Sequence, residues 1–163
     1  FTDRRQRQMC IRDRYSTIQY GIEVYSQGNK GGMKKIQIKQ NRALKVLYKK
    51  DFLTPTLELH REAKVLLVND IAKLNILKFV YKQRHGETPD AFRNYYIENM
   101  FIHAHNTRQA KNLHITTNKN KFGRKSLKYR GAVYWNETEG EIREAKSIKC
   151  FAKNIKNNMI EEY

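Results

Sequence analysis

Hydrophobic residues recur at helical spacing in four stretches of the chain, with polar positions between them. The first stretch spans residues 34–49, the second begins at Thr54-Pro55-Thr56, the third begins at Asn69 or Asp70, and the last follows Ser147. Apolar residues three or four positions apart lie on one face of an α-helix. Proline ends whatever helix precedes it, while Ser, Asn and Asp favour helix starts. The pattern therefore predicts four helices.

The remaining segments are less regular. Thr88-Pro89-Asp90 predicts the start of a short aromatic helix that contains Phe92, Tyr95, Tyr96 and Ile97. Residues 103–125 are polar and poorly periodic, which predicts a loop with a brief strand at residues 113–116. The expected fold class is mainly α, a small irregular helical domain with little or no strand.

Residues 5–14 show no hydrophobic period and no capping signal. A basic arm is one interpretation of them. The other, which we favour, is the translated adapter of a transposase-based sequencing library, fused in frame to the protein. We therefore predict that residues 1–14 are disordered and lie outside the fold. Residues 15–100 then form a helical region, and residues 101–163 form a basic C-terminal segment with a loop and a terminal helix.

The charge of the chain narrows the class of partner. Lys and Arg number 33 against 16 acidic residues, a net charge of +17, and without residues 1–14 the remainder keeps 28 basic and 14 acidic residues. Such an excess favours a polyanion as partner. No apolar run approaches the roughly 20 residues of a membrane span. We expect no membrane partner and an intracellular location, nucleus or cytoplasm.

Cations and aromatic rings alternate in residues 119–130. Together they hold phosphates and stack unpaired bases, although a solvated basic loop with inward aromatics remains the alternative. The candidate nucleic-acid-binding residues are Lys35, Lys39, Arg42, Arg108, Lys119, Lys121, Arg124, Lys125, Lys128, Arg130, Lys149 and Lys153. The candidate core residues are Tyr20, Gly21, Leu44, Leu77, Tyr81, Trp135 and Phe151.

Catalytic and metal-binding patterns are weak in this sequence. His103, His105 and His114 lie close along the chain, but no carboxylate or thiolate accompanies them, so surface histidines are the expected outcome. Two-metal polymerase chemistry needs clustered carboxylates, and the sequence has no Asp-Asp pair. The two cysteines, Cys10 and Cys150, are too few for a disulfide framework or a zinc site. We expect no catalytic residue, metal or cofactor in this chain.

Three groups of motifs follow one another in a fixed order. They are residues 20–25 with 40–44; residues 74–82 with Gly86, Pro89 and Phe92; and residues 106–108 with Ser126, 129–136, Ile142, Ser147, 151–153 and Tyr163. In this order the motifs resemble the C-terminal part of reverse transcriptases from non-LTR (LINE-type, jockey-like) retrotransposons. Two positions depart from the family pattern: Tyr25 stands where Trp is usual, and Asn41 where Lys is usual.

The resemblance implies a thumb-like helical region and a basic segment of an RNA-directed DNA polymerase, inactive alone. Its expected partners are template RNA, an RNA–DNA hybrid or target DNA, together with the palm and fingers domains of the same polypeptide. The palm carboxylates, which would bind Mg²⁺, would precede residue 1. A stand-alone basic RNA- or DNA-binding module and a ribosome-associated basic protein remain the alternatives.

Overall fold

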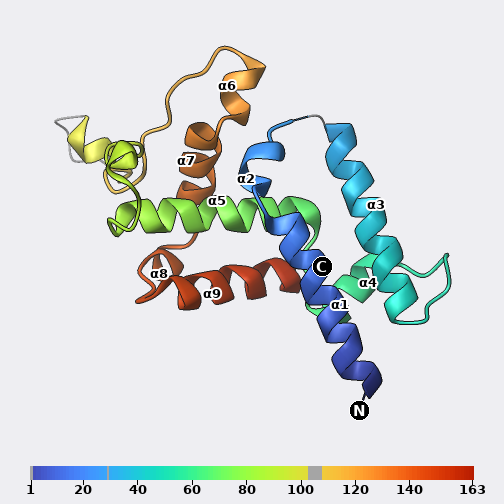
Figure 1. Ribbon diagram of the computed structural model, residues 1–163. Coiled ribbons are helices and arrows are strands. Elements are labelled where there is room, and N and C mark those ends of the chain that lie inside the picture. The colour runs from blue at the N-terminus through green and yellow to red at the C-terminus, as the bar shows by residue number, and fades with distance from the viewer. Residues whose placement is uncertain (1, 29, 103–107) are drawn as a thin grey trace. The chain divides into compact units, whose positions relative to one another are not determined.

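Helices make up most of the described chain, which in this computed structural model comprises residues 2–28, 30–102 and 108–163. The α-helices are α1 (Thr2–Gln19), α2 (Ile22–Tyr25), α3 (Lys30–Leu47), α4 (Thr56–Ala63), α5 (Val68–Arg84), α6 (Lys121–Lys125), α7 (Leu127–Glu137), α8 (Gly140–Arg143) and α9 (Ile148–Glu161), as Figure 1 shows. Short 3₁₀ helices span Asp90–Phe92 and Asn99–Phe101. The mainly α fold class is confirmed.

The chain divides into two compact units. The first unit comprises Phe1–Ala72 and Lys156–Tyr163, and the second comprises Lys73–Ile155. This division differs from the expected boundary near residue 100. The reason is that α5 and α9 each contribute residues to both units, and a hydrophobic period does not reveal where a helix changes its packing partners.

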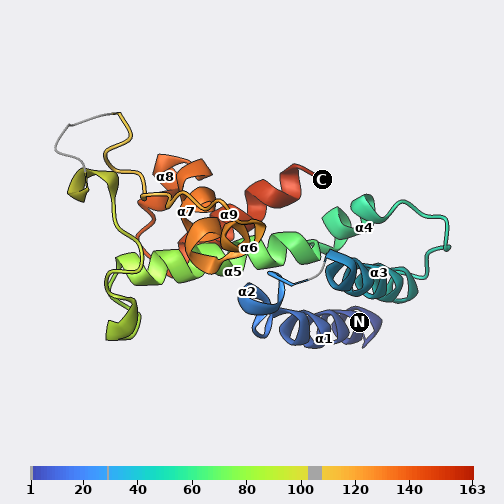
Figure 2. The same cartoon turned by 90° about the horizontal axis from the view of Figure 1, so that it is seen from above.

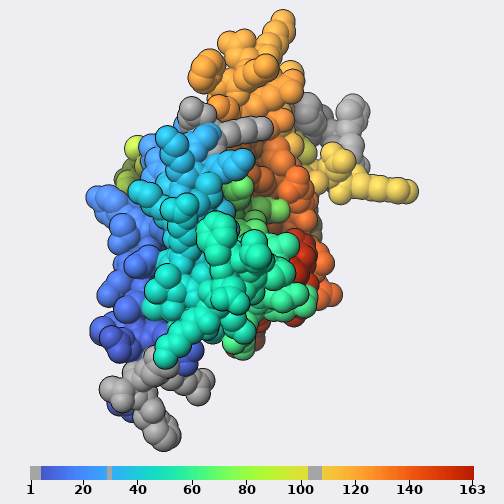
Figure 3. Space-filling model, turned by 90° about the vertical axis from the view of Figure 1, so that its right-hand side faces the viewer, coloured from blue at the N-terminus to red at the C-terminus, as the bar shows by residue number. Residues whose placement is uncertain are grey.

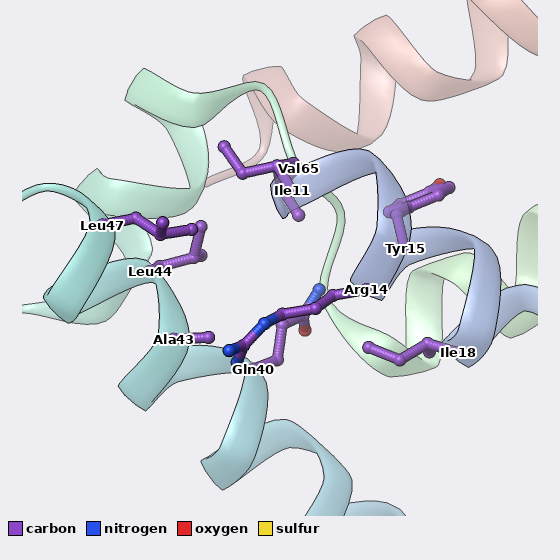
Figure 4. A pocket seen from close by; sticks show the side chains of 9 residues that line it. All are labelled: Ile11, Arg14, Tyr15, Ile18, Gln40, Ala43, Leu44, Leu47 and Val65. Carbon is purple, nitrogen blue, oxygen red and sulfur yellow. The ribbon is translucent and has the colours of Figure 1, made fainter. Parts of the chain in front are cut away.

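Helix α1 lies beside α3 in the first unit (Figures 1 and 2). Ile11, Tyr15 and Ile18 recur along one side of α1 and line a small cavity with Leu44 and Leu47 of α3, as Figure 4 shows. Burial raises the pKa of Tyr15 to about 12. The expected disorder of residues 1–14 is not what the structure has: residues 2–14 belong to α1, and Ile11 and Arg14 line this cavity. Their adapter origin stays a prediction about the nucleotide sequence.

One expected core residue of the first unit is exposed. Tyr20 is 87% exposed, so its assignment to the core was wrong. Gly21 follows it with a φ of 64°, a left-handed conformation that glycine adopts without strain. The chain turns there, and Ile22 occupies the buried position instead, with no exposed surface. Leu44, by contrast, is buried at 3% exposure.

Two glutamines of α3, Gln37 and Gln40, form hydrogen bonds to the backbone at Leu66 and Val68. Gln40 is 8% exposed, and its Nε2 donates to the Leu66 carbonyl at 3.0 Å. The Oε1 atom of Gln37 accepts the Val68 backbone N–H at 2.7 Å, and Gln37 Nε2 donates to Gln40 Oε1 at 3.1 Å. These bonds satisfy the backbone between α4 and α5, which explains the polar residue in an apolar face.

A buried histidine continues this polar interior. His60 of α4 has no exposed surface; its Nδ1–H donates to the Val65 carbonyl at 2.9 Å, and its Nε2 lies 2.9 Å from Asn41 Oδ1. The ring meets the Tyr163 ring edge to face at 6.4 Å. The Tyr163 hydroxyl donates to Asp70 Oδ2 at 2.5 Å and accepts the Leu67 N–H at 2.9 Å.

Aromatic stacking holds the second unit together. The rings of Tyr81 and Phe151 stack at a centroid distance of 4.8 Å, and Trp135 lies 5.8 Å from Phe151. The Tyr81 hydroxyl donates to the Ala145 carbonyl at 2.6 Å. Leu77, Tyr81, Trp135 and Phe151 all lie buried, at 2% exposure or less.

The short aromatic helix expected after Pro89 is only the 3₁₀ turn Asp90–Phe92. Phe92 and Tyr95 meet the Phe79 ring of α5 edge to face, at 5.2 and 6.1 Å. Gln83 Nε2 secures the turn by donating to the Arg93 carbonyl at 2.8 Å. Packing against α5 has overridden the helix-start signal.

The expected loop and brief strand in residues 103–125 also need correction. Within the described part of this range, the strand is reduced to an isolated bridge between Glu98 and Leu113, and residues 121–125 form α6. At the other end of the chain, Ser147 caps α9 as predicted, since its Oγ accepts the Cys150 N–H at 3.2 Å.

Candidate nucleic-acid interface

The junction of α6 and α7 carries the mixed segment of cations and aromatic rings. Lys119, Lys121, Arg124 and Lys128 are exposed there, while Lys125 and Arg130 are half-buried. Phe122 is 84% exposed. The Phe122 ring is therefore exposed to solvent, whereas the alternative of a solvated basic loop expected the aromatic rings to point inward. Residues 119–130 contain no acidic residue, so the segment supplies no carboxylate of its own to neutralise these cations.

Local hydrogen bonds shape α6 although it is only five residues long. Gly123 packs so closely on Asn118 that a Cβ atom would lie 2.8 Å from Asn118 Cγ. Arg124 Nε donates to the Asn118 carbonyl at 3.3 Å. Ser126 ends α6 and caps α7, because its hydroxyl donates to the Gly123 carbonyl at 2.6 Å and accepts the Tyr129 N–H at 3.3 Å. The chain therefore changes direction at Ser126.

Several cations of this segment lie over aromatic rings. Lys125 Nζ is 5.8 Å from the centre of the Phe122 ring, and Lys128 Nζ is 5.7 Å from that of Tyr95. Arg130 Nε donates to the Tyr134 hydroxyl at 3.2 Å. A cation over a ring face is attracted by the π electrons. The arrangement places positive charge next to an exposed ring that is open to a stacking partner.

A close contact with the 3₁₀ region fixes the start of α7. The Tyr96 hydroxyl donates to the Leu127 carbonyl at 2.9 Å. A Cβ atom at Gly131 would lie 2.0 Å from that hydroxyl oxygen, so only glycine fits there without a shift of Tyr96. Burial raises the pKa of Tyr96, which keeps its hydroxyl a donor. The Tyr96 contact thus holds the α7 end of the interface segment in place.

Sequence reasoning missed the residues that fix the end of α7. The Asn136 side chain accepts the Leu113 N–H and donates to the Leu113 carbonyl, both at 2.8 Å. Arg143 donates to the Thr138 carbonyl at 2.6 Å and to the Asn136 carbonyl at 2.9 Å. Burial and the charge of Arg84 lower the pKa of Arg143. The motif around Trp135-Asn136 is therefore structural, and no periodicity could have indicated it.

The other predicted cations belong to other elements of the chain. Lys35, Lys39 and Arg42 are exposed on α3 of the first unit, at spacings that keep them on neighbouring turns. Lys149 and Lys153 are exposed on the part of α9 that belongs to the second unit, and Arg108 is exposed as well. Six of the twelve predicted cations lie within residues 119–130, at the junction of α6 and α7.

A cavity of about 690 Å³ in the first unit also has basic walls. Arg7, Arg12, Lys64 and Lys156 line it, and burial and Lys64 lower the pKa of Lys156. Arg7 and Arg12 belong to the stretch that we interpret as adapter-derived. For this reason the cavity carries no functional argument.

Metal-ligand clusters and membrane-spanning helices are absent from the described residues. No group of three potential His, Cys, Asp or Glu ligands is found among them, and no helix there is long and apolar enough to cross a bilayer. His103 and His105 lie outside the described residues, and His114 is half-buried. The candidate histidine cluster therefore lies mostly outside the described residues.

Comparison with known proteins gives no further information on the family. The chain matches no protein-family model, no curated protein and no solved structure. The resemblance to non-LTR reverse transcriptases accordingly rests on the ordered motifs alone.

Proposed function

We propose that the chain is the nucleic-acid-binding thumb and C-terminal part of a mobile-element reverse transcriptase, and that the α6–α7 junction grips its nucleic acid. The observation that carries the proposal is the exposed Phe122 ring among exposed cations with no acidic residue in the segment. Such a surface suits a sugar–phosphate backbone beside an unpaired base. The ordered motifs and the excess of 28 basic over 14 acidic residues outside residues 1–14 support the same partner class.

In this proposal the cations position the nucleic acid and carry little sequence information. Contacts to phosphates fix register, whereas base edges carry the sequence. The Phe122 ring then stacks on whichever base is unpaired nearby, because every base has a π face. The palm and fingers of the parent enzyme supply the polymerisation chemistry, with their own carboxylates and Mg²⁺.

The salt dependence of binding tests the proposed interface. We expect the affinity of the full chain for an RNA–DNA hybrid with a single-stranded overhang to fall steeply as salt rises, through counterion release. Replacing Lys119, Lys121 and Arg124 with Ala should reduce the slope of log affinity against log salt by roughly 2 to 3, because each lost phosphate contact removes about 0.7 to 0.9. Fluorescence anisotropy measures this slope.

A matched control separates the interface from bulk charge. Lys82, Lys111 and Lys146 are also exposed, and their replacement with Ala removes the same three charges elsewhere. Equal slopes for the two triple variants would contradict a localised interface. Phe122→Ala should weaken binding to the overhang by about 1 to 3 kcal/mol and leave blunt duplex binding unchanged.

The polymerase parentage has its own test. An extended transcript of the same locus should encode an Asp-Asp pair on a predicted hairpin upstream of residue 15, because the palm requires it. A start codon directly before residue 15 would instead favour a stand-alone basic binding protein.

A further inference from the structure

Two large apolar residues occupy the tip of the turn between α3 and α4. Phe52 is 75% exposed and Leu53 is 91% exposed. The Thr54 N–H donates to the Asp51 carbonyl at 3.1 Å, so Phe52 and Leu53 are the two central residues of this turn. Gly, Pro, Asn, Asp and Ser normally hold such positions. An apolar pair displayed at a turn tip indicates a surface that meets a partner.

Hydrogen bonds and a cation–π contact anchor the turn to α3. Lys45 Nζ donates to the Phe52 carbonyl and lies 5.2 Å from the centre of the Phe52 ring. The Lys50 N–H donates to the Lys45 carbonyl at 2.9 Å, and Lys49 adopts a left-handed conformation with a φ of 50°. One lysine therefore secures both the backbone and the ring of Phe52, so the tip is formed before any partner arrives.

Positive charge surrounds the apolar tip. Lys49 and Lys50 are exposed beside it, Lys45 lies beneath it, and Asp51 is the acidic residue of the turn. Figure 3 looks onto this face, where α3, the connecting turn and α4 run from cyan to green. A partner that fits must combine negative charge with flat apolar surface within a few ångströms. Stacked bases between two phosphate backbones have both properties.

We propose that Phe52 and Leu53 form a wedge that enters between stacked bases of a nucleic acid, with Lys49 and Lys50 on the adjacent phosphates. Proteins that kink or unstack a duplex insert Phe, Leu, Ile or Met side chains in this way. The proposal rests on the proposed function in one respect, that the chain binds nucleic acid. It uses residues of the first unit, distinct from the α6–α7 junction of the second.

Base unstacking is the direct readout of a wedge. The full chain is titrated onto an RNA–DNA hybrid and onto a DNA duplex that carry 2-aminopurine within a flexible pyrimidine–purine step, since such steps open most easily. Fluorescence of 2-aminopurine rises when its stacking is lost. We expect a rise of several-fold at saturation, and the double variant F52A/L53A should lose it while its affinity changes by less than about tenfold.

The matched control is the double variant Y20A/V24A. Tyr20 and Val24 are likewise an aromatic and an aliphatic residue, 87% and 68% exposed in the same unit. This variant should keep the fluorescence rise. The triple variant at Lys119, Lys121 and Arg124 should bind more weakly, yet show the full rise once saturated.

Each outcome bears on a different claim. Binding without a fluorescence rise overturns the wedge and leaves the proposed function standing, as does a rise that F52A/L53A retains. Absence of binding to either nucleic acid overturns both. Binding to vesicles of anionic phospholipid that F52A/L53A abolishes, without any 2-aminopurine signal, assigns the tip to a lipid surface and overturns the wedge.

Discussion

The two units keep their interiors together by different means. In the first unit, buried amides and a buried imidazole satisfy the backbone between α4 and α5, with Gln40 and His60 as central members. In the second unit, the rings of Tyr81, Trp135 and Phe151 stack on one another. Polar networks lose stability when one member is left without its partner, whereas aromatic cores lose it when volume is removed. The units should therefore respond differently to the same kind of substitution.

The largest effect is expected in the aromatic interior. Phe151→Ala should lower the free energy of unfolding by about 3 to 5 kcal/mol, because it leaves a cavity between Tyr81 and Trp135. Hydrogen exchange followed by mass spectrometry should show the faster exchange in peptides of residues 73–155. Phe122→Ala is the control, since Phe122 is exposed and its removal should change stability by less than about 0.5 kcal/mol.

A smaller loss is expected from making the first unit more apolar. Gln40→Leu should lower the free energy of unfolding by about 1 to 3 kcal/mol, although leucine is more hydrophobic, because the Leu66 carbonyl loses its donor in a buried site. Urea unfolding measures the change, and Gln109→Leu at an exposed position is the control. A Gln40→Leu chain as stable as the parent would show that the network is dispensable and erase the contrast between the units.

The smallest effect is a dependence on pH. Burial lowers the pKa of His60 below its ordinary value, against the opposing influence of the Val65 carbonyl and Asp70. The unfolded chain therefore takes up a proton near pH 6.5 that the folded chain resists, so stability should fall as pH drops below that value. Urea unfolding at pH 7.5 and 5.5 should show a larger drop for the parent than for His60→Gln. Stability that rises on acidification relative to His60→Gln would mean that the folded state prefers the charged imidazole.

The sequence could predict elements that depend on a long apolar period or on a local cap. Helices α3, α5 and α9 follow such periods, and Ser147 caps α9 as expected. The α6–α7 pair could not be predicted from the sequence. Helix α6 is too short to show a hydrophobic period, and it depends on the packing of Gly123 against Asn118. The aromatic residues after Pro89 fit a helix in isolation, whereas the structure has a 3₁₀ turn there, with Phe92 and Tyr95 packed on Phe79.

The candidate interface was only partly predictable for a related reason. Charge and the mixture of residues in 119–130 indicated cations on the surface, and Lys119, Lys121, Arg124 and Lys128 are exposed, but the sequence did not indicate which ring faces outward. Burial of Tyr96, for example, depends on its contact with Gly131, which lies far along the sequence. The side chains of Asn136 and Arg143 form hydrogen bonds to backbone groups, and the amino-acid composition does not reveal such bonds.

The discontinuous make-up of the first unit has a consequence for protein synthesis. Most of this unit is made early, yet Lys156–Tyr163 belongs to it, and the Tyr163 hydroxyl bonds to Asp70 and to the Leu67 N–H. Residues 156–163 must therefore have been synthesised before the first unit can close. Until then the nascent first unit lacks the hydroxyl partner of Asp70, while residues 73–155 are already complete. The second unit, by contrast, is continuous in sequence and needs no later segment, so the first unit closes only after all of the second has been synthesised.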